Sequence, residues 1–351
     1  MNYVGVDYHK KYSYMVVKDE NGNVAGRGTV NNTREEVQQF LEPYRPGMAV
    51  VEATRNWGLI YDWLDEVLDD VALAHPLKVK AIAEARIKTD KISADILADL
   101  LRANLIPKAY APAREIRELK SILRQRMFLV RIQGMVKNRI YDILDRHPEV
   151  LGQAPEVSDL FGAAGTRWLN GVVLQGEDNR LLTNELELLA FVRGRIAESN
   201  SVVKELAKKD TKAQLLQTIP GIGPFFSLLI LYEIDDISRF RSEKNLCAYA
   251  GLVPSTYASG GKVFHGRITK TGSKWLRWAA VEAVQPAIRN NPDFYAYYQR
   301  TKARKGNNAA KVATARRLLT VVYRILKHGR PFERRITAQE QRIVPAALVS
   351  I

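Results

Sequence analysis

The first thirty residues constrain the fold of this chain most strongly, because they hold three short extended segments in direct succession. Residues 3–7, 12–17 and 24–30 are rich in β-branched and aromatic residues, which favour strands. Asn21-Gly22 stands between the second and third segments and is a strong signal for a hairpin turn. We therefore predict an antiparallel meander of three strands at the start of the chain.

Helices and strands alternate after this meander. Thr33 is a capping residue for a helix that reaches about residue 44, and the apolar run 48–53 predicts a buried central strand. The later segments are an amphipathic helix over 57–68 with Leu59, Ile60, Trp63, Leu64 and Val67 on one face, a strand over 71–74, and helices over 76–86 and 90–101. The order βββαβαβα is typical of an α/β, RNase H-like (RuvC-like) nuclease core, in which the first and fourth strands are neighbours.

Acidic residues stand at the ends of these two neighbouring strands. Asp7 ends the first strand and Glu52 ends the fourth, so we expect their carboxylates to converge. Asp90 begins the last helix and shares a face with Ser93, whereas Asp95 lies roughly 140° around that helix. Carboxylates are the ligands that Mg²⁺ prefers, and two such ions can hold the attacking and leaving oxygens of a phosphodiester in line. Each acid taken alone is more simply explained as a solvated strand end, and only the pair at neighbouring strands indicates a site.

Two long amphipathic helices are predicted after residue 112. The first covers 112–147, with Ile116, Leu119, Leu123, Val130, Met135 or Val136, Ile140 and Leu144 at helical spacing. The second covers 178–208, with Leu182, Leu186, Leu189, Val192, Ile196, Val203 and Leu206. A connector over 153–180 joins them, which favours an antiparallel coiled-coil hairpin; an ordinary helical subdomain is the alternative.

A compact C-terminal domain begins near residue 215. Its first feature is the turn IPGIGP, whose Gly221 and Gly223 are typical of helix-hairpin-helix proteins that present backbone N–H groups to a phosphate. Helices are expected over 244–250, 274–288 and 309–327, with the basic segment RTKARKGNN between the last two and a loosely held tail at the end. The predicted domains are 1–111, 112–210 and 211–330, followed by the tail 331–351.

The stretch from Gly251 to Trp278 combines hydroxyl groups with positive charge. Three hydroxyl residues, Ser255, Thr256 and Ser259, stand before Gly260-Gly261. Five cations follow the glycines without an acid between them: Lys262, Arg267, Lys270, Lys274 and Arg277. A hydroxyl beside such a positive field suits the attack on, or the binding of, a phosphate backbone. A basic surface hairpin without catalytic function is the alternative.

Positive charge is concentrated in the same part of the chain. The net charge is +15, and residues 260–330 hold 16 Lys and Arg against two acids. This segment predicts a polyanionic partner, with Lys302, Arg304 and Lys305 among its phosphate contacts.

The remaining composition narrows the class of protein. The single cysteine, Cys247, lies in an apolar run and is expected in the core. The N-terminus lacks the apolar core of a signal peptide and no apolar run approaches a membrane span, so we expect a reducing, cytoplasmic setting and no membrane partner.

Several segments together resemble one family of proteins. They are VGVDYHK, VEATRNWG around Glu52, KTDKISADILADLLRANLIP around Asp90, IPGIGPFFSLLILYEIDDISRF, and AYAGLVPSTYASGGKVFHGRITKTGSKWLR. In this order they resemble the transposases of the Piv-invertase and IS110 insertion sequences, also called bridge-RNA-guided recombinases. The resemblance covers residues 1 to about 330.

The resemblance implies a RuvC-like domain with a four-acid DEDD site, a coiled-coil arm, and a C-terminal domain with a nucleophilic serine. By motif, Asp7, Glu52 and Asp90 match the first three acids and the Mg²⁺ ligands, and Ser259 matches the nucleophile. The fourth acid is expected three residues after the third, where this chain has Ser93. Either Asp95 moves in, or three acids suffice, or the copy is weakened. The family also implies donor and target DNA, a structured bridge RNA, and a dimer or tetramer as partners.

Three functions therefore compete. The first is a DNA recombinase that forms a covalent phosphoserine link. The second is a RuvC-like nuclease or junction resolvase without such a link. The third is a nucleic-acid-binding protein whose catalysis has been weakened by the loss of an acid at Ser93.

Overall fold

The structure is a computed structural model, which describes all residues except 55, 84–88, 260–261 and 334–351. The chain divides into two compact units, Met1–Arg117 and Glu118–Ile351. The first unit ends six residues after the boundary predicted at residue 111, and beyond that point the two later domains predicted from sequence both lie in the second unit. Each unit is described separately below.

Unit 1 is built on one mixed sheet of five strands in the order β3-β2-β1-β4-β5. The strands are β1 (Asn2–Tyr8), β2 (Tyr12–Lys18), β3 (Val24–Asn31), β4 (Gly47–Glu52) and β5 (Asp70–Ala74). The first three strands are antiparallel, whereas β4 is parallel to both β1 and β5. The predicted meander, its turn and the pairing of the first and fourth strands are all confirmed.

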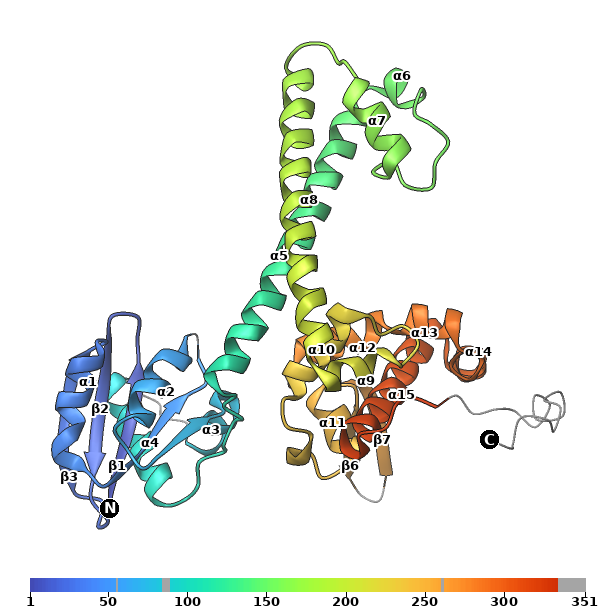
Figure 1. Ribbon diagram of the computed structural model, residues 1–351. Coiled ribbons are helices and arrows are strands. Elements are labelled where there is room, and N and C mark those ends of the chain that lie inside the picture. The colour runs from blue at the N-terminus through green and yellow to red at the C-terminus, as the bar shows by residue number, and fades with distance from the viewer. Residues whose placement is uncertain (55, 84–88, 260–261, 334–351) are drawn as a thin grey trace. The chain divides into compact units, whose positions relative to one another are not determined.

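Helices cover both faces of this sheet (Figure 1). They are α1 (Arg34–Leu41), the 3₁₀ turn η1 (Glu42–Tyr44), α2 (Trp57–Asp65), α3 (Pro76–Ile82) and α4 (Asp90–Arg102). Thr33 caps α1 as predicted, because its side chain accepts a hydrogen bond from Glu36 N. The predicted helix over 76–86 extends into residues 84–88, which lie outside the described part of the chain.

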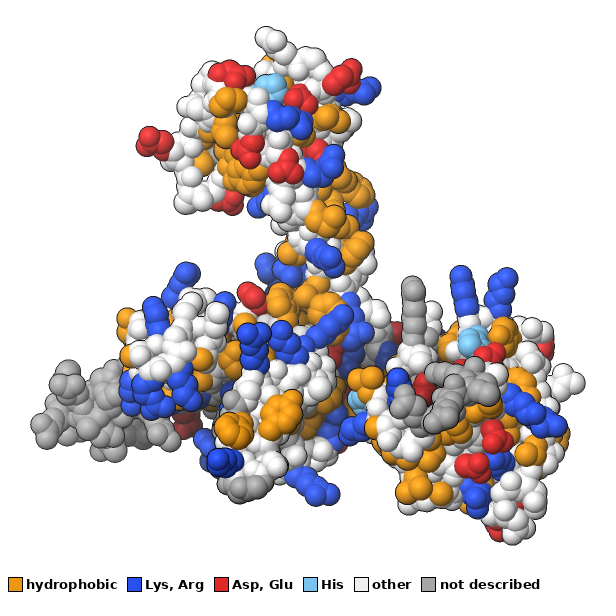
Figure 2. Space-filling view, turned by 180° about the vertical axis from the view of Figure 1, so that it is seen from behind, with side chains coloured by type: hydrophobic (Ala, Val, Ile, Leu, Met, Phe, Trp, Pro, Cys, Tyr) orange, Lys and Arg blue, Asp and Glu red, His pale blue; other side chains and the backbone are white. Residues whose placement is uncertain are grey.

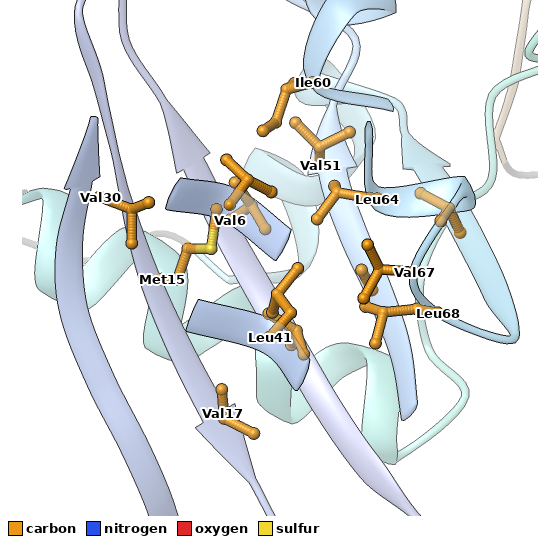
Figure 3. Close-up of a cluster of buried hydrophobic side chains, with 14 of the residues drawn as sticks. Val6, Met15, Val17, Val30, Leu41, Val51, Ile60, Leu64, Val67 and Leu68 are labelled. Atoms are coloured by element: carbon orange, nitrogen blue, oxygen red, sulfur yellow. The ribbon is translucent and has the colours of Figure 1, made fainter. Parts of the chain in front are cut away.

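The larger core of unit 1 lies between the sheet and the helices α1 and α2 (Figure 3). Val6 and Met15 from the sheet pack with Leu41 of α1 and Leu64 of α2, and each of these four side chains is fully buried. The prediction for α2 is wrong at Leu59, which is 50% exposed, since this position lies on the opposite side of the helix from Leu64. A second cluster on the other face of the sheet includes Val50, Ala72, Val79, Leu97 and Leu101, so α3 and α4 close that face.

Unit 2 is mainly helical. Its helices are α5 (Arg114–Leu144, which begins in unit 1), α6 (Pro148–Leu151), α7 (Ala163–Gly171), α8 (Glu177–Lys209), α9 (Thr211–Gln217), α10 (Pro224–Ile234), the 3₁₀ turn η2 (Ile237–Arg239), α11 (Glu243–Tyr249), α12 (Lys274–Glu282), α13 (Val284–Asn290), α14 (Pro292–Lys305) and α15 (Asn307–His328). Two strands, β6 (Pro254–Ser259) and β7 (Lys262–Ile268), form an antiparallel hairpin.

The two long helices predicted after residue 112 are present as α5 and α8. Polar pairs show that they run antiparallel: Arg126 Nε donates to Asn200 Oδ1 over 2.7 Å, and Arg139 Nε donates to Glu185 Oε1 over 2.6 Å. The predicted apolar face is wrong at Val130, which is 39% exposed. Of the two alternatives Met135 and Val136, Val136 is the buried one. The buried cluster near the turn also takes in α7 and the connecting loops, through Leu160, Phe161, Leu169 and Leu174. This packing shows a helical hairpin with a small subdomain at its end.

Cys247 is buried, as predicted. Its thiol donates to the carbonyl oxygen of Arg316 over 3.7 Å, and burial raises the pKa of the thiol. Among the described residues, the helices are all too short or too polar to cross a lipid bilayer.

Candidate active site and nucleic-acid groove

Two carboxylates meet where the central strands of the unit 1 sheet end. β1 and β4 are parallel with Val6 opposite Val51, so the following residues, Asp7 and Glu52, reach the same edge of the sheet. Both line a cavity of about 360 Å³, whose other walls come mainly from α3 and α4. The convergence expected for these two acids is therefore present.

Gly5 determines how closely α4 lies against β1. A Cβ atom built on Gly5 would stand 1.9 Å from the carbonyl oxygen of Ala94 and 2.6 Å from the amide nitrogen of Ala98. Only a residue without a side chain fits between this strand and this helix. The close contact brings α4, and with it Asp90, toward the end of β1.

Asp90 occupies the first position of α4. Thr89 caps the helix by accepting a hydrogen bond from Ile92 N over 3.3 Å. Tyr12 of β2 donates from its hydroxyl to Asp90 Oδ2 over 3.0 Å. This hydrogen bond and the nearby charge of Asp90 raise the pKa of Tyr12, so the phenol stays protonated and continues to orient the carboxylate.

Asp90 lies beside Asp7 and a third residue, His9, which the sequence analysis did not single out. The distances from His9 Nε2 are 3.2 Å to Asp90 Oδ1 and 3.6 Å to Asp7 Oδ1, and the ligand atoms of the three residues all lie within 4.8 Å of one another. Two carboxylate oxygens and one imidazole nitrogen at such distances fit a divalent cation. The only sequence signal for His9 was its position two residues after Asp7, on the same side of an extended chain.

Ser93 and Asp95 lie on different sides of α4. Ser93 lines the cavity together with Asp7 and Glu52, whereas Asp90 is not among the residues that line it. Asp95 instead lies 3.0 Å from the buried ammonium of Lys18, which also lies 2.6 Å from Asp99. Although burial alone would lower it, the pKa of Lys18 is raised because both carboxylates hydrogen-bond the charged form. α4 is regular from Asp90 to Arg102, so in this structure Asp95 does not take the place of the missing fourth acid.

Ser259 lies at the end of the hairpin in unit 2. It is the last residue of β6, it is exposed, and it pairs with Lys262 across the hairpin. Ser255 is engaged elsewhere, because its hydroxyl donates to the carbonyl oxygen of Arg267 over 3.1 Å. The two glycines that follow Ser259, 260–261, lie outside the described residues. The position of Ser259 suits a hydroxyl that must approach a bulky phosphodiester.

The base of the hairpin is attached to the helical body by backbone hydrogen bonds. Thr269 N donates to Val253 O over 2.9 Å, and Ser273 N donates to Tyr249 O over 2.8 Å. The Ser273 hydroxyl caps α12 and also donates to Oε2 of the buried Glu233 over 3.0 Å. These contacts hold the base of the hairpin while its outer end, including Tyr257 and Phe264, stays exposed.

A basic groove of about 1,100 Å³ runs between the base of this hairpin and the helices α14 and α15. Among the described residues, six cationic side chains and no acid line it; the cations are Arg267, Lys270, Arg300, Arg304, Lys305 and Arg316. Tyr297 lines the same groove. Figure 2 shows Lys and Arg side chains gathered over this part of the chain with few acids among them. Such a surface suits a phosphate backbone.

Four of these cations were predicted from the sequence, and Arg300 and Arg316 were not. Arg300 stands four residues before Arg304 on one helix, so both point to the same side, a spacing that would have identified it. The segment that holds Lys302 was expected to lie between helices, but it forms the end of α14. Lys302 is exposed and does not line the groove.

Other predicted contacts have structural roles. The Arg277 guanidinium donates to the carbonyl oxygen of Ala250 over 2.9 Å, and the Lys274 ammonium lies 5.2 Å from the centre of the Trp275 ring. Gly221 has a φ of 92°, and a Cβ there would stand 2.6 Å from Ala287 N. Close packing against α13 therefore explains this glycine without a phosphate. Gly223 precedes α10 as its N-terminal cap residue.

Known protein families match both the segment that contains the acidic cluster and the segment that contains the hairpin. Residues 4–148, which contain the acidic cluster, match a DEDD transposase family of IS110 elements. Residues 213–299, which contain the hairpin, match the family described as transposase IS116/IS110/IS902. The chain belongs to the IS110 family of insertion-sequence transposases.

Individual relatives of this transposase agree. It is 25% identical over 342 residues to a probable family 20 transposase of Pseudomonas aeruginosa, which covers 92% of this chain and 96% of the relative. It is 24% identical to the transposase for insertion sequence element IS1111A of Coxiella burnetii, over 92% of this chain and 89% of the relative. It is also 37% identical to the pilin gene-inverting protein of Moraxella bovis, over 36% of this chain and 40% of that protein.

Proposed function

We propose that this transposase cuts and rejoins DNA through a covalent phosphoserine intermediate at Ser259, assisted by divalent cations, Mg²⁺ in the simplest case, whose ligands include Asp7, Glu52 and Asp90. The observation that carries the proposal is the meeting of Asp7 and Glu52 at the end of two parallel strands, with Asp90 close to Asp7. A bound divalent cation would supply charge neutralisation at the scissile phosphate.

In the reaction proposed for Ser259, one phosphodiester bond is exchanged for another, so the energy of the bond is retained in the serine-linked intermediate. The hydroxyl loses its proton as its oxygen bonds to phosphorus, and the bond from phosphorus to one sugar oxygen breaks, leaving a sugar hydroxyl that takes up a proton. The serine phosphodiester is later attacked by a sugar hydroxyl of another strand, which restores Ser259. Lys262, which pairs with Ser259 across the hairpin, would stabilise the charge that develops at phosphorus.

The basic groove supports nucleic acid as the partner. Six cations without an acid suit a backbone that passes along α14 and α15 toward the hairpin. Donor and target DNA, a structured bridge RNA that selects the sites, and a dimer or tetramer formed through α5 and α8 complete the proposal, with the prokaryotic cytoplasm as its setting. The acids and the serine lie in different units of one chain, which is compatible with an active site shared between subunits.

A denaturing assay tests the covalent step. The full chain, with its guide RNA and labelled donor DNA, is incubated with and without Mg²⁺ and then denatured to reveal a protein–DNA adduct. The adduct is expected to require Ser259 and to disappear in Ser259→Ala, whereas Ser255→Ala serves as the matched control and should retain it. Cleavage without an adduct would establish the nuclease reading instead, and binding without cleavage would establish a weakened binding protein.

The groove has its own test. Arg304→Gln should weaken nucleic-acid binding and reduce the slope of log affinity against log salt by about 1, because one phosphate contact is lost. Lys302→Gln is the matched control, because it removes the same charge from the same helix outside the groove. Equal effects of the two substitutions would show that general charge, and not this groove, carries the binding.

A further inference from the structure

The imidazole of His9 has an unusual environment. Its Nε2 atom is buried and has no hydrogen-bond partner among the described residues, although the side chain as a whole is 40% exposed. A buried ring nitrogen without a hydrogen bond is costly unless a charged group lies against it. The atom lies instead 3.2 Å from Asp90 Oδ1 and 3.6 Å from Asp7 Oδ1. Neighbouring ligands of one ion with bonds of about 2.1 Å stand roughly 3 Å apart, so this spacing matches a shared cation.

The residues around His9 hold it in this position. Its backbone N–H donates to the carbonyl oxygen of Tyr12 over 3.0 Å, and its own carbonyl oxygen accepts from Asn32 Nδ2 over 2.7 Å. Its ring also packs against the Tyr12 ring, with 5.0 Å between the centroids. Tyr12 occupies Oδ2 of Asp90, which leaves Oδ1 directed toward His9. These contacts supply the supporting interactions that metal ligands require.

Asp7 belongs to two neighbouring groups of side chains. On the cavity side it lies with Glu52 and Ser93, and at the rim it lies with His9 and Asp90. The hydroxyl of Ser93 is a weak ligand compared with a carboxylate, so the cavity side offers only two strong ligands, Asp7 and Glu52. The rim has two carboxylates and an imidazole, and is therefore the stronger position for a cation.

We infer that His9 is a protein ligand of a divalent cation at the rim, where it compensates for the acid that is missing at Ser93. The inference deepens the proposed function, on which it rests for the use of a metal. An imidazole ligand suits transition ions better than Mg²⁺, which prefers oxygen ligands alone, so this site should favour Mn²⁺ over Mg²⁺. Asp7, Asp90 and His9 bind the ion, and Tyr12 positions Asp90.

The experiment uses the full chain without nucleic acid and Mn²⁺ as the probe. Pulsed electron paramagnetic resonance on the bound ion should show coupling to a histidine nitrogen, and growth with ¹⁵N-histidine should convert that coupling to the ¹⁵N pattern. Calorimetric titration should show one bound Mn²⁺, with at least a tenfold loss of affinity in His9→Ala. His328→Ala, which removes a histidine at the end of α15, is the control and should bind Mn²⁺ like the original chain.

Ser93→Asp separates this inference from the proposed function. If His9 compensates for Ser93, the substitution should add a second ion on the cavity side while the nitrogen coupling at the rim remains. Bound Mn²⁺ without nitrogen coupling would overturn the role of His9 and leave the acidic site intact. Binding of Mn²⁺ only after Ser93→Asp would also overturn it. The covalent adduct of Ser259 is read in a different assay, so its absence would count against the proposed function alone.

Discussion

Gly5→Ala should damage both the stability of unit 1 and its acidic site. The added Cβ would stand 1.9 Å from Ala94 O, whereas ordinary contacts begin at 3.4 Å, so α4 and β1 must separate by roughly 1.5 Å. Backbone atoms on both sides leave no flexible side chain to give way, so we expect a loss of about 3 kcal/mol in the free energy of unfolding. Because α4 carries Asp90, the 3.2 Å distance from Asp90 to His9 should open by a similar amount. Cation binding should weaken with it.

Hydrogen–deuterium exchange in peptides of β1 and α4 measures the first effect, and Mn²⁺ titration measures the second. Gly134→Ala is the control, because Gly134 lies in the exposed part of α5 with no atom within 4 Å of an added Cβ. That substitution should leave unit 1 unchanged and favour α5 by up to about 1 kcal/mol. Unaltered exchange and unaltered Mn²⁺ affinity in Gly5→Ala would refute the argument that this glycine sets the separation of strand and helix.

Three further outcomes follow from the structure. Leu144→Ala removes a fully buried side chain from the end of α5 and should cost about 2–5 kcal/mol in a urea titration; a change below 1 kcal/mol would show that the cluster collapses around the gap. Because burial raises the pKa of Cys247, iodoacetamide should label it only after denaturation, and rapid labelling of the native chain would contradict its burial. Hydrogen bonds from His147 and Arg146 lower the pKa of Asp178, so its contribution to stability is present above the unfolded-state value of about 3.9 and is lost as pH falls through the lower folded value. Melting curves of Asp178→Asn should therefore differ from the original at pH 7 and converge with it near pH 2; a constant difference would exclude this linkage.

The sheet of unit 1 was predictable because its signals are local. The strand segments alternate over few residues, the turn at Gly22 requires a positive φ of 86°, and the cap at Thr33 acts within three residues. The meeting of Asp7 and Glu52 then follows from the pairing of the two strands. Two strands that are each predictable from local sequence, once paired in the sheet, therefore bring residues distant in the sequence together.

Features that depend on contacts between distant segments could not be predicted in this way. His9 comes close to Asp90 only because α4 brings Asp90 to it across 81 positions of sequence, and its spacing from Asp7 alone does not indicate this contact. Both Leu59 and Leu64 are apolar residues of α2, but only the packing against the sheet shows that Leu64 is buried and Leu59 is exposed.

The helix α14 was missed for a different reason. Its start has a clear local signal, since Asn291 accepts hydrogen bonds from the N–H groups of residues 293 and 294 and Pro292 occupies the first turn. Only Phe294 and Tyr298 are buried along its length, so it lacks the apolar stripe by which amphipathic helices are found. The positive charge around Arg304 was consequently predicted from the sequence, but the groove that it lines was not.

The residues that hold α4 in place and the residue that faces the acidic site lie on different sides of this helix. Lys18 holds one side of the helix through Asp95 and Asp99, whereas Ser93 lies on the side of the cavity. A substitution at position 93 therefore changes the chemistry of the site without touching the ion pairs that attach the helix to the sheet. Over evolutionary time, such an element can lose or regain activity through a single codon while its protein continues to fold.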